Sequence, residues 1–494
     1  MPAVVRRPLP WLVTAALFLG VCLDAAGDLR LVEAAKSQNW TLVHGLLKQR
    51  VDVNASQPDG ATALHWAVYW DAVDAVDRLI RAGARVNASN ELGATPLWIA
   101  SSEGRAQMAE RLLQAGADPN AALSTGETPL MSASRAGSAQ AVKLLVAHGA
   151  KVNAREQGRG QTALMWAVAE QHADIVQALV EAGAEVDARS NVRRMLVNAG
   201  ADGLTRLTGD YTDLSEEEAG GFTPLLFAAR VGDLPSAKFL VAAGAKVNDA
   251  APTGASALVV AIHSGQSAVA EFLLEKGADP NAAGAGYTAL HAAILRGDVP
   301  LVKSLIARGA DHSAPITKST PTRRSSQDWA LHPSWVGASP IWLAARFSDA
   351  DLMRILAAAG GDARFARKDG TTVLMAPLAV GPDRRPFFAV ALPDPKELER
   401  RIAEAAAAAV DLGADVNAAN EAGDTALHAA AARKLDSVVQ LLADRGAKLE
   451  VKNNKGQTPL ALASAVPRRR TTDAADPSMN SSTADLLKKL GATE

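Results

Sequence analysis

Apolar residues recur along this chain in a fixed order that predicts pairs of short helices. In the stretch ATPLWIA (94–100), Leu97 and Ala100 lie three positions apart, which places both side chains on one face of a helix. A second apolar pair, Leu112 and Leu113, follows in the same unit. The opening motif recurs at ETPLMSA (127–133), QTALMWA (161–167), FTPLLFA (222–228), YTALHAA (287–293) and DTALHAA (424–430). We therefore predict a series of helix–turn–helix units.

The polar residues of each unit mark the ends of the predicted helices. The opening Thr can cap the first helix with its hydroxyl, and a Pro after it suits the first helical turn. Each unit closes on a Gly that can adopt the left-handed conformation after a helix, followed by a turn rich in Asn and Asp. These closing segments are AGARVNA (82–88), AGADPNA (115–121), HGAKVNA (148–154), AGAKVND (243–249) and LGADVNA (412–418). A single unit cannot bury its own apolar face, so the units must stack.

The spacing of the opening residues shows the family that the chain resembles. Thr62 to Thr95 and Thr95 to Thr128 are each 33 residues. Ankyrin repeats have this period and a T-P-L-H-x-A opening. From about residue 28 onward the chain therefore resembles the ankyrin-repeat family. The resemblance implies an all-α solenoid of about 12 helix–turn–helix repeats with β-turn fingers and inserted loops.

Departures from the period divide an otherwise continuous array, which we expect to form a single domain over residues 27–494. The first unit, residues 28–56, lacks the opening motif and has the character of an N-terminal cap. Insertions are expected near residues 190–220, 312–337, 379–395 and 466–482. Such inserts are either binding loops or neutral surface additions, and the Trp residues of the second insert, Trp329 and Trp335, favour binding there.

The N-terminus has the pattern of a secretory signal peptide over residues 1–26. Arg6 and Arg7 precede a 13-residue apolar run at 11–23, and small residues follow it. The run is short for a membrane span, which needs about 20 residues. We expect a periplasmic or secreted protein, and the alanine-rich composition is typical of a bacterial one. The alternatives are a membrane anchor formed by the uncleaved segment or by a lipid on Cys22, the only cysteine.

Composition and motifs argue against catalysis and against nucleic-acid binding. The net charge of −2 lacks the basic footprint of a nucleic-acid-binding protein. No catalytic, phosphate-binding or dinucleotide-binding motif occurs, and no pair of His residues has metal-ligand spacing. The resemblance assigns His65, His291 and His428 of the TALH motifs to bracing of the turn. We predict no catalytic residue, no cofactor and no metal.

Candidate binding residues lie four, seven and eight positions after each opening Thr, on one helix face. The resemblance makes this face the concave binding surface. Aromatic and Arg side chains, which are enriched at protein-binding hot spots, recur there. The candidates are Trp66, Tyr69, Trp70, Trp166, Phe227, Arg230, Arg296, Arg346 and Phe347.

The candidates differ in how far they should extend from the core. Trp66, Trp166 and Phe227 could belong to the core or to the surface. We expect Tyr69, Trp70 and Phe347 to lie further out and to bind. Two further Trp residues replace the motif His and are expected to be structural, namely Trp98 and Trp342.

The function expected from these features is an exported, non-catalytic scaffold. It would be a monomer that binds an unidentified protein partner on the concave face and the turn tips. It would contact no nucleic acid, and no membrane after cleavage of the signal. Two alternatives remain open: a membrane-anchored assembly factor, and a small-ligand binder or enzyme whose pocket is formed by an insert such as 315–337.

Overall fold

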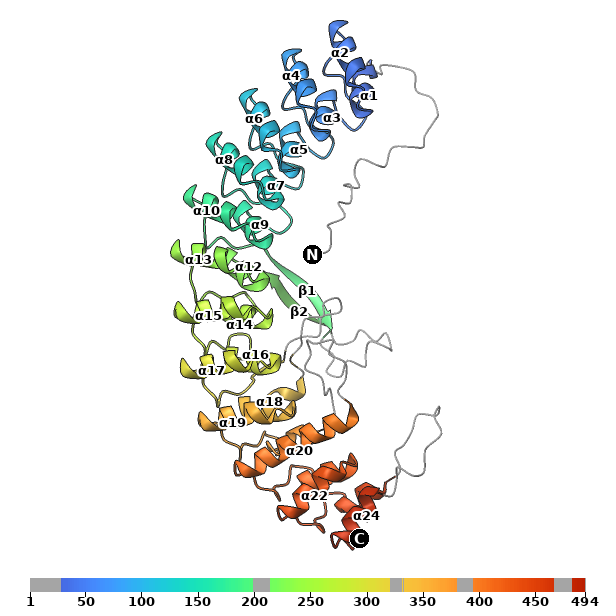
Figure 1. Cartoon of the computed structure of the whole chain (residues 1–494), viewed down its shortest axis with the longest axis vertical. Helices are drawn as coiled ribbons and strands as arrows, with labels where there is room; N and C mark the ends of the chain where they lie inside the picture. The colour runs from blue at the N-terminus through green and yellow to red at the C-terminus, as the bar shows by residue number, and fades with distance from the viewer. Residues whose placement is uncertain are drawn as a thin grey trace. The chain divides into compact units, whose positions relative to one another are not determined.

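The computed structural model describes residues 28–198, 214–319, 331, 333–379, 394–465 and 482–493 (Figure 1). The predicted signal peptide lies outside these ranges. The chain divides into two compact units, Met1–Ala150 and Lys151–Glu494, which are described separately below. Both consist of paired helices, and this confirms the predicted all-α repeat architecture.

The first unit contains four helix pairs. Its helices are α1 (Arg30–Lys36), α2 (Trp40–Lys48), α3 (Ala63–Tyr69), α4 (Val73–Arg81), α5 (Pro96–Ser102), α6 (Ala106–Gln114), α7 (Pro129–Ala136) and α8 (Ala139–Ala147). The first helix of each pair packs on the first helix of the next, in the order α1, α3, α5, α7. Each pair thus buries the apolar stripe of its neighbour, as the sequence pattern requires.

The second unit repeats this plan and adds a two-stranded sheet and a long helix. Its helices before the strands are α9 (Ala163–Ala169) and α10 (Ala173–Glu181). The elements that follow are β1 (Val192–Asn198), β2 (Leu214–Gly220), α12 (Pro224–Val231), α13 (Leu234–Ala242), α14 (Ala257–His263), α15 (Ser267–Glu275), α16 (Ala289–Arg296), α17 (Val299–Ala307), η2 (Pro333–Trp335), α18 (Pro340–Arg346), α19 (Ala350–Ala358), η3 (Ala376–Leu378), α20 (Pro395–Asp411), α21 (Ala426–Ala432), α22 (Asp436–Asp444), α23 (Pro459–Ser464) and α24 (Ser482–Lys489).

The opening Thr, or a Ser in its place, caps the first helix of most pairs in the way that the sequence predicts. The Thr95 hydroxyl accepts a hydrogen bond from the Trp98 backbone N–H, and Pro96 takes the first helical position. A finger precedes each first helix, and a short antiparallel bridge between Ser56 and Thr62 joins the two sides of one finger. These features confirm the β-turn fingers that the resemblance implied.

The closing Asn of each repeat ties it to the next repeat. The Asn54 side-chain amide donates to the Gly83 carbonyl at 3.1 Å, and its oxygen accepts from the Arg85 backbone N–H at 2.7 Å. The same pair of bonds is made by Asn87, Asn153, Asn248, Asn281 and Asn417. Because an amide both donates and accepts, one side chain satisfies two backbone groups of the following turn.

The first insert forms an antiparallel hairpin. Strands β1 and β2 pair from Val192 opposite Gly220 to Asn198 opposite Leu214, and residues 199–213 lie outside the described part of the chain. Helix α9 nevertheless packs on α12, and α10 packs on α13, as in consecutive repeats. The hairpin therefore projects from the stack of helix pairs in the second unit without interrupting it (Figure 1).

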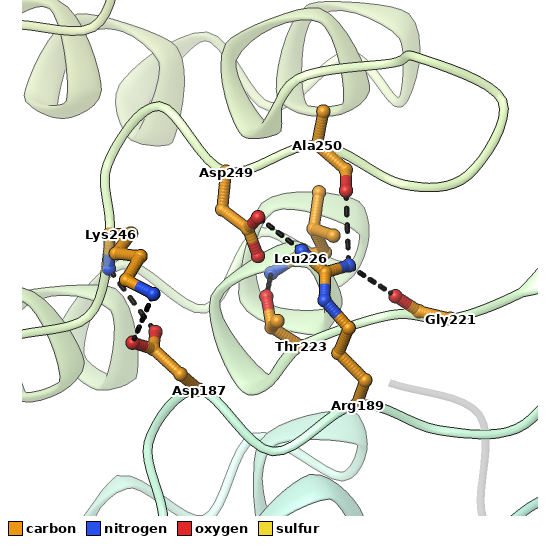
Figure 2. A network of polar contacts seen from close by, with 8 residues as sticks. All are labelled: Asp187, Arg189, Gly221, Thr223, Leu226, Lys246, Asp249 and Ala250. Atoms are coloured by element: carbon orange, nitrogen blue, oxygen red, sulfur yellow. Dashed lines mark hydrogen bonds and ion pairs between the residues drawn. The ribbon is translucent and has the colours of Figure 1, made fainter.

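An arginine network joins the two repeats on either side of the hairpin (Figure 2). The Arg189 guanidinium donates to the carbonyls of Gly221 at 2.8 Å and Ala250 at 3.0 Å, and it forms an ion pair with Asp249. Gly221 follows the hairpin directly, whereas Ala250 and Asp249 belong to the turn of the next repeat. One side chain therefore fixes both the exit of the hairpin and the adjoining turn.

The repeat before the hairpin has Asp187 at the position of the closing Asn. Asp187 follows Thr162 by 25 residues, as Asn87 follows Thr62. The Asp187 carboxylate accepts from the Lys246 backbone N–H at 3.3 Å, but an ionised carboxylate cannot donate to a carbonyl. Arg189, two positions later, adds a second link to the next repeat by donating to the Ala250 carbonyl.

Replacing Arg189 with leucine should destabilise the repeats around the hairpin. The change leaves two backbone carbonyls and the mostly buried Asp249 carboxylate without this donor, at an expected cost of about 1–3 kcal/mol. Native-state hydrogen exchange of peptides from α12 and α13 would measure it. Arg193→Leu, at an exposed site on β1, is the matched control. Equal effects of the two substitutions would contradict the role of Arg189.

Candidate protein-binding surface

The motif histidines brace the repeat, as the family resemblance implied. The His65 Nδ1 accepts from the Thr62 backbone N–H at 3.1 Å, so its Nε2 carries the proton and donates to the Ala94 carbonyl at 3.1 Å. His428 makes the corresponding bonds to Thr425 and to the Gln457 carbonyl. Both side chains are buried, and both ring nitrogens of each are hydrogen-bonded within the repeats, so they are not available for binding a partner.

Burial also fixes the charge state of two of these histidines. Desolvation lowers the pKa of His65 to about 4, and it lowers the pKa of the fully buried His291 to about 4 as well. Both rings are therefore neutral at neutral pH. This state matches the bonding at His65, where one ring nitrogen accepts and the other donates.

Trp342 replaces the motif histidine and makes the equivalent bond. Its Nε1 donates to the Thr371 carbonyl at 3.2 Å, and Thr371 lies 29 residues further along the chain, as Ala94 does from His65. The ring is 2% exposed, and the Arg367 guanidinium lies 4.9 Å from its centroid. The predicted structural role of Trp342 is confirmed. Trp98 is likewise buried, at 5% exposure.

Three aromatic side chains of helix α3 lie edge to face in the first unit. The centroids of Trp66 and Tyr69 are 6.0 Å apart, and those of Tyr69 and Trp70 are 4.8 Å apart. Trp66 is only 5% exposed, so this ring belongs mainly to the core, whereas Trp70 is 39% exposed and Tyr69 is half-buried. Perpendicular rings of this kind attract one another through the positive edge of one and the negative face of the other.

Hydrogen bonds hold these rings in place. The Trp66 Nε1 donates to the Gln57 side chain at 3.1 Å, and the Trp70 Nε1 donates to the Lys36 carbonyl at 3.1 Å. The Lys36 ammonium lies 5.4 Å from the centroid of the Trp66 ring, within the range of a cation–π interaction. We call Lys36, Trp66, Tyr69 and Trp70 together the α3 surface.

An arginine from the next repeat forms hydrogen bonds with the last turn of helix α3. The Arg105 Nη1 donates to the carbonyls of Val68 at 2.5 Å and Tyr69 at 2.6 Å. These carbonyls belong to the last turn of α3, where no intrahelical donor is available. The position of Tyr69 and Trp70 is therefore fixed by the adjacent repeat as well as by their own helix.

In the second unit, Phe227 is buried and Arg230 is exposed beside it. Phe227 is 4% exposed and meets Phe222 edge to face, with centroids 5.7 Å apart. The exposed Arg230 guanidinium lies 5.2 Å from the Phe227 centroid and 5.4 Å from the Phe222 centroid. Trp166 is half-buried. The structure therefore places Phe227 mainly in the core and Arg230 on the surface.

Arg296 forms a hydrogen bond with the preceding repeat, whereas its repeat position predicted only a role in binding a partner. Its Nη1 donates to the His263 carbonyl at 2.6 Å, at the end of helix α14 in the preceding repeat. Burial lowers the pKa of Arg296 from its usual value. Arg105 in the first unit, at a different repeat position, likewise donates to carbonyls at the end of the preceding first helix, α3.

The prediction that Phe347 lies exposed is wrong. Phe347 is 7% exposed, and its ring meets Trp335 edge to face with centroids 5.4 Å apart. Trp335 belongs to the second insert, which therefore covers this site. Arg346 is also buried, at 5% exposure. Trp329 of the same insert lies outside the described residues.

Sequence reasoning missed Lys36 and Arg105 because their contacts join different repeats. A signal was available for Lys36, which lies 33 residues before Tyr69 and so occupies the same repeat position. The cap unit lacks the opening motif, so this correspondence is not marked by a Thr. Arg105 lies ten positions after Thr95, outside the candidate positions four, seven and eight.

The chain belongs to the ankyrin-repeat family. The family model, which describes three copies of the repeat, matches residues 31–123, 119–190, 194–284, 225–316 and 401–470. Ankyrin repeats generally mediate protein–protein interaction, and the family is typically non-catalytic.

Curated relatives share only part of this chain. Neurogenic locus notch homolog protein 1 of Mus musculus is 36% identical over 143 residues, and that of Homo sapiens is 35% identical over 144 residues. Each match covers 26% of this chain and 6% of the relative. The chain thus spans a small fraction of the length of these relatives.

The described residues contain neither a cluster of metal ligands nor a membrane-spanning helix. Within them, no group of three or more His, Cys, Asp or Glu side chains is placed to hold a metal ion. No helix in this part of the chain combines the length and apolar character needed to cross a membrane.

Proposed function

We propose that this protein is a non-catalytic scaffold that binds a partner protein through the α3 surface. The observation that carries the proposal is the exposure of Trp70. This residue is 39% exposed, although its Nε1 is hydrogen-bonded to the Lys36 carbonyl and the neighbouring Trp66 is buried. A rigid aromatic side chain loses little conformational entropy on binding, and covering it removes a large apolar area from water. Trp and Tyr are also the residue types enriched at binding hot spots.

Replacing Trp70 with alanine should weaken capture of the natural partner. An anchor of this kind contributes about 2 kcal/mol or more, so we expect a loss of about 30-fold in affinity. The full-length protein would be used to isolate partners from its source, and the affinity of each partner would be compared between wild type and Trp70→Ala.

The matched control is Leu42→Ala, which removes an exposed apolar side chain from α2 in the same unit. Thermal unfolding of both variants would show whether the repeats remain folded. If folded Trp70→Ala retains wild-type affinity for every partner, the α3 surface is not the binding site.

A further inference from the structure

The ammonium group of Lys36 is held in place without a counter-charge. Its recorded partner is the Trp66 ring, at 5.4 Å from the centroid. Among the described residues of the first unit, no carboxylate lies within ion-pair distance of this ammonium. A cation that lies over an aromatic face and forms no ion pair within its own unit can pair with a carboxylate of a partner.

The remaining polar atoms of the α3 surface divide into those already bonded and one that is available. Both indole N–H groups donate within the unit, Trp66 to Gln57 and Trp70 to Lys36. The Tyr69 hydroxyl has no hydrogen-bond partner among the described residues, and its side chain is half-buried beside Trp70. The surface thus offers a partner two donors, the Lys36 ammonium and the Tyr69 hydroxyl, next to an apolar ring.

Acidic side chains near the α3 surface are already engaged. Glu103 lies 3.7 Å from the Arg105 guanidinium, and Asp71 lies 4.0 Å from it. Glu33 accepts a hydrogen bond from the Gln57 side chain at 2.8 Å. Arg105 offsets the charges of Glu103 and Asp71, and Lys36 would repel a basic partner and attract an acidic one.

We propose that the α3 surface recognises an extended protein segment in which an Asp or Glu stands beside an apolar residue. The carboxylate accepts from Lys36 and Tyr69, and the apolar residue covers the ring of Trp70. This inference rests on the proposed scaffold function and specifies the chemistry of the partner. Burial of the apolar residue against Trp70 contributes to the affinity. The contact between the carboxylate and Lys36 discriminates between apolar segments with and without an acidic residue.

A displayed library of random octapeptides, selected on the full-length protein, tests the chemistry. Wild type should enrich Asp or Glu next to a large apolar residue. Lys36→Gln should abolish the acidic preference and keep the apolar one, and it should weaken the binding of a selected acidic peptide about tenfold. Lys36→Glu should shift the preference to Lys and Arg. Trp70→Ala should remove the apolar preference.

Lys48→Gln is the control, because it removes an exposed lysine of the same unit on helix α2 and should leave the selection unchanged. A basic preference, an acidic preference that survives Lys36→Gln, or a library without binders would overturn the inference. If capture of the natural partner depends on Trp70 but the charge preference does not follow residue 36, the scaffold function stands and only the partner chemistry fails. If capture is independent of Trp70, the scaffold proposal itself fails.

Discussion

Replacing Trp342 with alanine should destabilise the middle of the second unit by about 3–5 kcal/mol, the cost of removing a large ring from a packed core. The ring is 2% exposed, packs under Arg367, and bonds to the Thr371 carbonyl of the next repeat. Truncation therefore opens a cavity and removes one of the two hydrogen bonds to the Thr371 carbonyl, which also accepts from the Arg367 backbone N–H. Native-state hydrogen exchange of peptides from α18 and α19 would measure the loss, because neighbouring repeats unfold with different free energies.

Trp342→His is the informative control for this prediction. Histidine is the residue that His65 and His428 provide at the same repeat position, where its Nε2 reaches the carbonyl 29 residues on. The variant should therefore recover a substantial part of the stability lost with alanine. If histidine is as damaging as alanine, or if alanine costs under about 1 kcal/mol, then Trp342 does not replace the motif histidine.

The repeat architecture could be predicted because every determinant is local. Thr at the cap, Pro in the first turn and Gly after the second helix each act within a few residues, and all three agree in unit after unit. Each repeat packs only on its neighbours, so no long-range strand order had to be inferred. The Thr95 cap and the closing Asn54 bonds follow directly from their positions in the period.

The first insert could not be predicted from the same rules. Residues 196–202, LVNAGAD, have the form of the end of a second helix, yet β1 runs through Asn198. No opening motif precedes this segment, so it has no first helix of its own to pack against. Short helices depend on tertiary packing, and here residues 192–198 pair with β2 instead.

The exposure of the candidate residues also could not be predicted from the sequence, because it depends on which side chains contact them. Arg230 and Arg296 occupy neighbouring repeat positions, but one lies over two Phe rings and the other caps a helix. The position of Phe347 in the repeat predicts an outer residue, but Trp335, twelve residues upstream, packs against its ring and covers it. The partner of Arg296 comes from another repeat and that of Phe347 from an insert, and the period carries no information about either.

Lowering the pH from 7 to 5 should destabilise the repeats that contain His65 and His291 by about 2 kcal/mol each, given their pKa values of about 4. The unfolded chain binds a proton near the ordinary histidine pKa of about 6.5, whereas the folded rings resist protonation until the pH approaches 4. The stability from the neutral rings is thus complete above pH 6.5 and falls as the pH drops towards 4. Denaturant unfolding at both pH values would measure the change.

The variant His65→Gln, His291→Gln separates this effect from other titrations. Glutamine at this place in the helix can accept from the cap N–H in a capping box, and it does not titrate. Stability at pH 7 should fall modestly, since the bond from His65 to the Ala94 carbonyl is altered, but the loss between pH 7 and 5 should shrink by about 4 kcal/mol if both sites contribute equally. An unchanged pH dependence would show that the neutral histidines do not control acid stability.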